Sequence, residues 1–316
     1  QIAGFYQLTY GPAKGLQLGS GINMALGGMT GAQLSWLANV SDGGFRGFQG
    51  AFLNINRGPA RGVSAGLVNV NTSDMHGLQA GLVNLTLSAK ESQGAHLGLV
   101  NVNRSTNSFA GAMVGLVNVG KHVRGVQVGL VNVADEVEGA QVGLVNFANK
   151  NNGASIGLLP LVLDGYNHAA VWFSDNSYVN LGAKLGTRHV YVLLGVGLTR
   201  DRDDNDHRMF SSTWGIGGHL TTAKIPFFLD IDLVDTHFHS EGHWAETDSS
   251  LSSLRLQLGW RLARHLAVIA GPTLNVRVAR DDLDRAPRMV GPLEKVWHHD
   301  GTTIRMYPGL VAGLQF

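Results

Sequence analysis

The sequence predicts an all-β protein in two parts, a glycine-rich β-solenoid followed by an antiparallel transmembrane β-barrel. Three observations predict this fold class. The first half repeats one short alternating unit, and the second half contains longer strands with one apolar and one polar face. The sequence also contains no run of 18 apolar residues, so no membrane-spanning helix is expected.

The composition is that of a folded chain. The 316 residues include 43 glycines but only 8 prolines, and 44% are hydrophobic, which excludes collagen and a disordered Pro/Gly tract. The net charge of +1 gives no basic field, so we expect no nucleic-acid partner. The absence of cysteine excludes disulfides and thiolate chemistry. The chain begins at Gln1 rather than Met, as an exported chain does once its signal peptide has been removed.

The first half is built from ten copies of a unit best written GxQxGLVNV. Successive copies start 14 to 17 residues apart. Their first residues are Gly15, Gly31, Gly47, Gly62, Gly77, Gly94, Gly111, Gly125, Gly139 and Gly153. Apolar and polar residues alternate within a copy, which predicts strands rather than helices.

Two all-β architectures fit these repeats, a solenoid with one copy per coil or a single barrel of about 18 strands. A barrel strand requires about five outward apolar side chains to cross the apolar part of a bilayer. One copy supplies three, such as Val126, Val128 and Leu130, and no Tyr or Trp occurs from Gly62 to Gly153 to form an aromatic girdle. These observations favour the solenoid and leave the single large barrel as the alternative.

Within the solenoid we expect the aliphatic residues to be buried. Val126, Val128 and Leu130 would stack on their equivalents in the next coil as an apolar wall, with Gln127 on the opposite, outward face beside the glycines. Asn132 would stack on the asparagines of neighbouring coils as a hydrogen-bonded ladder.

The composition changes near Asp164, and we expect the repeat region to occupy residues 1–165 and a barrel to occupy residues 166–316. Five of the six Trp and ten of the thirteen His lie in the second region. Its strands are longer, as in 254–262, where four Leu and Trp260 alternate with Arg, Gln and Gly. Long and short polar segments alternate between such strands, which predicts about eight barrel strands with long loops on one side and short turns on the other.

The inward faces of these strands carry charge. Asp230 and Asp232 lie on one face, where they would form salt bridges with inward arginines or, in a second interpretation, share a site as catalytic acids. The expected lumen charge network consists of Asp230, Asp232, Arg255, Arg261, Arg277 and Arg305. A serine nucleophile is not indicated, because His219 lies too far along its strand to reach Ser211.

A histidine cluster is the sharpest local motif. His237 and His239 share one face at the end of a strand, and His243 follows in the next turn. Three imidazoles at this spacing are candidate ligands for Zn or Cu, but an exposed polar loop without a metal is the favoured interpretation.

The last residues, MYPGLVAGLQF, place Leu310, Leu314 and Phe316 on one face. This pattern resembles the terminal signal of bacterial outer-membrane barrels, which implies recognition by the barrel-insertion machinery. The repeats are similar to the GLVN-type surface repeats of bacterial envelope proteins, a resemblance that implies no particular activity. Trp36 and Pro160 depart from the repeat pattern, and we expect their copies to cap the ends of the solenoid.

Together these features predict a non-enzymatic structural or binding protein in the outer membrane of a Gram-negative-type bacterium. Its expected partners are outer-membrane lipid and another envelope protein or a glycan. Two other functions remain open, a pore or transporter formed by one large barrel and a barrel hydrolase that acts on lipid.

Overall fold

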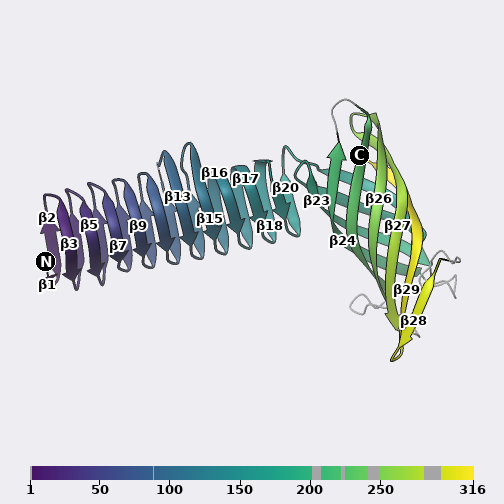
Figure 1. The fold of residues 1–316 in the computed structure, drawn as a ribbon, viewed down its shortest axis with the longest axis horizontal. Coiled ribbons are helices and arrows are strands. Elements are labelled where there is room, and N and C mark those ends of the chain that lie inside the picture. Colours follow the sequence, from purple (N-terminus) through teal and green to yellow (C-terminus); the bar gives the residue numbers. More distant parts are fainter. Residues whose placement is uncertain (1, 88, 201–207, 222–224, 241–248, 281–292) are drawn as a thin grey trace. The chain divides into compact units, whose positions relative to one another are not determined.

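The computed structural model describes residues 2–87, 89–200, 208–221, 225–240, 249–280 and 293–316 (Figure 1). Every element in these ranges is a β-strand. The chain divides into two compact units, Gln1–Asp164 and Gly165–Phe316. The first unit is a parallel β-solenoid and the second is a closed antiparallel β-barrel, as the sequence predicts. No helix within the described ranges is long and apolar enough to span a membrane.

The solenoid is one continuous ladder of parallel strands. The strands are β1 (Ile2–Ala3), β2 (Tyr6–Thr9), β3 (Ala13–Gly19), β4 (Ile22–Ala25), β5 (Met29–Ser35), β6 (Ala38–Ser41), β7 (Phe45–Gly50), β8 (Leu53–Asn56), β9 (Ala60–Ala65), β10 (Val68–Asn71), β11 (Met75–Ala80), β12 (Val83–Thr86), β13 (Glu91–Leu97), β14 (Val100–Asn103), β15 (Ser108–Val114), β16 (Val117–Val128), β17 (Val131–Val142), β18 (Val145–Asn151), β19 (Ala154–Ile156) and β20 (Leu159–Val162). Up to β14, a strand pairs with the strand two places further along, so Gly62 of β9 lies opposite Gly77 of β11. Corresponding repeat positions therefore stack in register from coil to coil. In β16 and β17 the second strand of one coil runs without a break into the first strand of the next.

A single coil consists of two short strands joined by a tight corner. In β11 and β12 the corner is Gly81–Leu82, and the side chains buried between the two strands are those of Met75, Gln79, Asn84 and Thr86. The four inward positions of this coil thus hold the Gln and Asn of the repeat, a threonine and one apolar residue. In other coils Ser, His or Met takes the place of the Gln. The interior of the solenoid is largely polar.

The prediction that the aliphatic residues of the repeat are buried is wrong. Gln127 and Asn132 are 0% exposed, whereas Val126 is 38%, Val128 39% and Leu130 54% exposed. The corner at Gly129 and Leu130 interrupts the strand alternation, so Asn132 turns inward together with Gln127. The amides can occupy the interior because identical neighbours in adjacent coils satisfy their hydrogen bonds, which lone buried amides would lack.

The predicted asparagine ladder is present and runs through nine coils. Each side chain donates from Nδ2 to the Oδ1 atom of the next asparagine, at 2.8 to 3.2 Å, through Asn23, Asn39, Asn54, Asn69, Asn84, Asn101, Asn118, Asn132 and Asn146. Each Nδ2 atom also donates its second hydrogen to a backbone carbonyl just before the next corner, as from Asn118 to Val128 at 2.9 Å. Pro160 lies opposite Asn146 and ends the ladder. Trp36, by contrast, belongs to a coil whose Asn39 takes part in the ladder, so that coil continues the stack.

From Gly31 to Gly153, the first glycine of each repeat is required by close approach of neighbouring coils. Gly125 has a φ of +140°, and a Cβ atom there would lie 2.0 Å from the carbonyl oxygen of Gly111. A side chain at this position is excluded both by the backbone conformation and by the neighbouring backbone.

Eight antiparallel strands close the barrel. They are β21 (His168–Ser174), β22 (Ser177–Gly186), β23 (Val190–Arg200), β24 (Arg208–Thr221), β25 (Phe227–Ser240), β26 (Ser249–Ala263), β27 (Leu266–Arg280) and β29 (Thr302–Gln315). Each pairs with the next, and β29 pairs with both β27 and β21, which closes the ring. Between β27 and β29 lies an additional strand, β28 (Lys295–His299), which pairs with the start of β29.

The two faces of the barrel differ as expected. On β26 the side chains of Ser253, Arg255 and Gln257 are buried in the interior, whereas the intervening Leu256 and Leu258 are 42% and 60% exposed. The interior is filled by bulky groups, and Tyr191, Lys184, Phe238 and Arg277 are among the largest fully buried side chains.

Candidate functional site in the barrel interior

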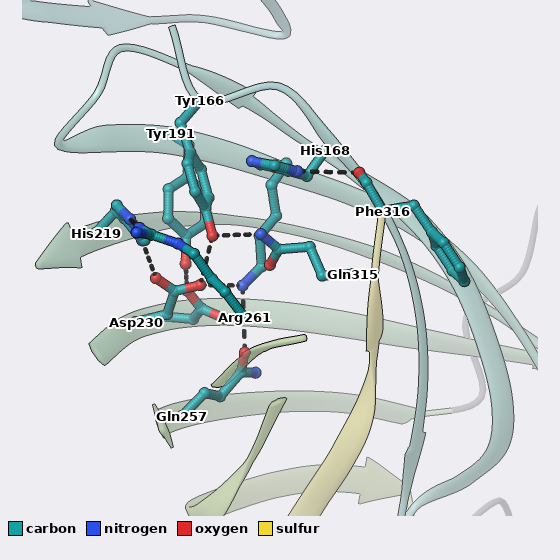
Figure 2. A network of polar contacts seen from close by, with 11 residues as sticks. Tyr166, His168, Tyr191, His219, Asp230, Gln257, Arg261, Gln315 and Phe316 are labelled. Atoms are coloured by element: carbon teal, nitrogen blue, oxygen red, sulfur yellow. Dashed lines mark hydrogen bonds and ion pairs between the residues drawn. The ribbon is translucent and has the colours of Figure 1, made fainter. Parts of the chain in front are cut away.

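A network of polar side chains lies inside the barrel (Figure 2). Some of its members line a pocket together with residues of the short turn between β26 and β27. The centre of the network is Asp230 of β25, which is 0% exposed. The register of β24 and β25 places His219 directly opposite Asp230, and the register of β25 and β26 places Gln257 opposite it on the other side. Because all three positions point inward, their side chains converge.

Asp230 binds three neighbours with its two oxygens. Oδ1 lies 2.6 Å from Nδ1 of His219, and Oδ2 lies 2.5 Å from Nζ of Lys184 and 3.2 Å from the hydroxyl of Tyr166. Lys184 also contacts Oε1 of Gln257 at 3.2 Å. A buried carboxylate requires such partners, and here the ammonium group of Lys184 neutralises it directly.

His219 is held in one orientation. Its ring stacks on that of Tyr166 with the centroids 4.0 Å apart, and Tyr166 is in turn fixed by a 2.5 Å hydrogen bond from Nε2 of Gln315. Because the carboxylate of Asp230 accepts, Nδ1 of His219 donates, which leaves the Nε2 lone pair free to accept. That atom lies 3.5 Å from Nη2 of Arg261, which also donates to Oγ1 of Thr221 at 2.7 Å.

The Nε2 side of His219 borders a pocket of about 330 Å³. The lining includes the basic residues Arg261, Arg264 and His265, with Tyr166 and Phe228 among the aromatic residues. An aspartate-oriented imidazole beside a basic pocket can accept a proton from water, and Arg261 is placed to stabilise a neighbouring negative charge. The carboxylate of Asp230 is shared between the imidazole of His219 and the ammonium group of Lys184.

The second aspartate, Asp232, is also buried and forms a separate contact. It accepts a hydrogen bond from the Tyr191 hydroxyl and lies opposite Arg255 in the β25–β26 register. The guanidinium of Arg255 lies 5.8 Å from the ring centre of Trp172. The two aspartates therefore have different hydrogen-bond partners, although the ammonium group of Lys184 interacts electrostatically with both.

The other expected arginines of the lumen network lie apart from the aspartates. Arg277 donates to Oγ of Ser249 at 3.1 Å, and Arg305 forms an ion pair with Glu294 at 3.2 Å. Asp230 has two principal partners, Lys184 and His219. Neither was expected from the sequence as a partner of this carboxylate. One feature of the sequence could have indicated Lys184, because it is the single lysine in the otherwise uncharged strand 177–186.

The histidines proposed as metal ligands are placed differently from the lumen network. His237 and His239 alternate with the buried Thr236 and Phe238 and so lie on the outward face of β25. His237 Nε2 contacts Asp235 at 3.0 Å, and His239 Nε2 lies 3.3 Å from Oγ of Ser212. His243 lies outside the described residues. Within the described ranges no group of three His, Asp or Glu residues is arranged to hold a metal ion.

The C-terminal residues lie on the outside of the barrel. Leu310, Leu314 and Phe316 are 58%, 40% and 47% exposed. They point outward from β29, the strand that closes the barrel against β21. The row is thus accessible on the apolar surface rather than packed in the interior.

Comparisons with known proteins leave these features to be interpreted on their own. No protein-family model, curated protein or solved structure matches this chain.

Proposed function

We propose that this chain is an outer-membrane protein of a Gram-negative-type bacterium, with no catalytic activity. The barrel anchors it in lipid, and the repeats present an extended surface to another envelope protein or to a glycan. The supporting observation is the outward face of β26, where five consecutive outward positions are apolar and 42% to 60% exposed. These are Leu254, Leu256, Leu258, Trp260 and Leu262.

The height of this row suits a bilayer. Five alternate residues on a strand tilted by about 40° span roughly 20 Å along the barrel axis, close to the ~25 Å apolar band of outer-membrane barrels. Ser250 and Ser252 follow on the same face at one end, and Arg264 and His265 lie beyond the other. A β-barrel with a polar interior and an apolar exterior would be unfavourable in water. The same arrangement is usual in a transmembrane β-barrel.

The experiment is expression with a signal peptide in a Gram-negative host, followed by membrane fractionation and electrophoresis of unboiled and boiled samples. We expect the chain in the outer-membrane fraction, with a mobility that changes on boiling. Leu256→Arg should reduce the folded fraction, because an arginine near the bilayer midplane costs about 2–4 kcal/mol. The matched control, Ser252→Arg, lies on the same face outside the apolar row and should fold normally. Recovery of the folded chain in the soluble fraction without detergent would refute the proposal.

A pore is the less favoured function. The interior of the eight-strand barrel is occupied by large side chains, among them Tyr191, Arg255 and Arg277. We therefore expect the purified chain in planar bilayers to show almost no ion conductance. Stable unitary currents at moderate voltage would restore the pore as the leading function.

A lipid-directed hydrolase is supported by one observation, the contact between His219 and Asp230 beside a pocket with Arg261. In this candidate function His219 Nε2 takes a proton from water, which attacks the ester carbonyl, and the alcohol leaves with that proton. Thin-layer analysis of phospholipid and lipid A incubated with the wild type and with His219→Gln tests it. Lipid that stays intact with the wild-type chain would remove this candidate.

A further inference from the structure

The surface of the solenoid is strongly segregated into an apolar and a charged edge. The apolar edge, here called the leucine edge, follows the tight corners of nine coils. Its residues are Trp36, Phe52, Leu67, Leu82, Leu99, Leu116, Leu130, Leu144 and Leu158. All are between 41% and 68% exposed. At the spacing of adjacent strands, about 4.8 Å, the row is about 38 Å long.

The leucine edge continues onto the flanking strands. The column immediately before the corners includes Leu97, Val114, Val128, Val142 and Ile156, each 38% to 42% exposed. With the corner residues this makes an apolar surface on the order of 1,000 Å², above the roughly 300–600 Å² of the largest patch on a typical soluble monomer. A surface of this size marks an interaction site.

Charged residues gather at the opposite turns of the coils, here called the charged edge. Ion pairs join neighbouring coils there, between Arg124 and Glu138 at 3.0 Å and between Lys150 and Glu136 at 2.7 Å. From Gly62 to Leu158 the outward positions of the repeat motif on either side of the corners carry no charge. The coil cross-section is therefore amphipathic, like that of an interfacial helix.

The shape of the leucine edge favours lipid as its partner over a second copy of this chain. The corner residue is more exposed than the apolar residues beside it, as shown by Leu130 at 54% against Val126 and Val128 at 38% and 39%. Apolar residues lie on both sides of the corner, so the edge is a convex ridge. Two such ridges would meet along a line and leave both flanks in water, whereas fluid acyl chains can cover the tip and both flanks together.

The backbone of the edge is also suited to an apolar medium. The corner residues are hydrogen-bonded from coil to coil, as from Leu116 N to Leu99 O and from Leu130 N to Leu116 O, both at 2.9 Å. Asparagine side chains satisfy the carbonyls just before the corners. Contact with hydrocarbon therefore does not require these backbone groups to lose water without replacement. Trp36, at one end of the row, packs edge-on against Phe52 and adds an aromatic residue of the kind favoured at membrane interfaces.

We infer that the solenoid is itself a membrane-binding element, with its leucine edge lying in the interfacial region of a lipid leaflet and its charged edge in water. This inference rests on the proposed function only in that the barrel brings the chain to a membrane. It assigns to the repeats a lipid ligand in addition to any protein or glycan partner.

Site-directed spin labelling tests the inference directly, because the chain has no cysteine and single labels can be introduced without background. The full chain is reconstituted into phosphatidylethanolamine/phosphatidylglycerol vesicles at a low protein-to-lipid ratio. Leu99→Cys and Leu130→Cys label the leucine edge, and Glu138→Cys labels the charged edge. Leu258→Cys, on the barrel exterior, is the positive control for lipid contact.

We expect the ratio of oxygen to nickel-chelate accessibility at both leucine-edge labels to exceed that at Glu138→Cys by about threefold or more, as for groups a few ångströms below the lipid headgroups. Leucine-edge labels with the accessibility of Glu138→Cys would overturn the inference, while a lipid-like Leu258→Cys would leave the proposed function intact. An aqueous Leu258→Cys would refute both. Leucine-edge labels shielded from both reagents, with spin–spin broadening between molecules, would show that a second copy covers the edge and would also overturn the inference.

Discussion

His96 provides a direct test of how the interior of the solenoid is organised. It occupies the inward column that glutamine fills in many coils, with Gln79 on one side and Met113 on the other. Burial lowers its pKa to about 4. Nε2 lies 3.3 Å from Oγ1 of Thr86, and no described atom forms a hydrogen bond with Nδ1. A protonated ring would therefore carry a buried, unpaired N–H and a buried charge.

The sign and size of the effect follow from the two pKa values. An exposed histidine titrates near 6.5, so between pH 6.5 and pH 4 the unfolded chain binds the proton that folded His96 does not. Acidification thus favours unfolding in this window, and the loss stops below about pH 4. The complete difference corresponds to about 3 kcal/mol, of which about 2.5 kcal/mol is lost between pH 7.5 and 4.5.

The assay is hydrogen exchange of the peptide covering residues 91–114 in the full chain, corrected for the pH dependence of intrinsic exchange. Local opening is the suitable measure, because coils of a solenoid contact only their neighbours and need not unfold together with a barrel. His96→Gln restores the residue that is common in this column and is the matched control. We expect the wild-type coil to lose about 2.5 kcal/mol more than the variant on acidification. Equal losses in the two proteins would refute the assignment of a neutral, buried His96.

Three further substitutions probe the other contacts. Gly125→Ala should lower the free energy of unfolding by more than about 3 kcal/mol, because the added Cβ meets a backbone oxygen. The adjacent, exposed Val126→Ala should lower it by well under about 1 kcal/mol. Urea unfolding followed by circular dichroism distinguishes the two variants. Asn118→Ala should cost about 2–4 kcal/mol in the same assay, since it leaves two polar groups in the interior without partners, and a cost near zero would contradict a continuous ladder. Lys184→Met should destabilise the barrel by about 3–5 kcal/mol, and adding Asp230→Asn should restore part of this stability. The stability of each variant is measured as the temperature at which the electrophoretic band of the folded form disappears. Additive losses in the double variant would argue against pairing of Lys184 with Asp230.

The sequence predicted the architecture well because repetition is itself structural information. Ten copies at nearly equal spacing imply ten equivalent coils, and identical asparagines in register imply a ladder. The side chains of the repeat that point into the solenoid were predicted incorrectly, and the reason is local. The alternation was extended across the corner at Gly129 and Leu130, where a change of direction brings Gln127 and Asn132 to the same side.

The barrel interior was predictable only in part. Alternation along one strand was enough to place Asp230 and Asp232 inside. The partner across the lumen depends on strand tilt and stagger, which a sequence does not display, so Lys184, 46 residues before Asp230, was not anticipated. Neighbours on the adjacent strand depend on hairpin register, which explains why His219 was considered with Ser211 on its own strand rather than with Asp230 opposite.

The register of the asparagine ladder has a consequence for the length of this protein. An asparagine needs only another asparagine before and after it. From Gly47 onward the repeats vary in length between 14 and 17 residues, and this variation falls outside the GxQxGLVN segment. Removal of residues 125–138 would join Arg124 to Gly139, which already occupies the position equivalent to Gly125 in the next coil. Such a deletion should leave a shorter but intact stack, so that gene duplication or loss can adjust the reach of the solenoid in increments of about 4.8 Å.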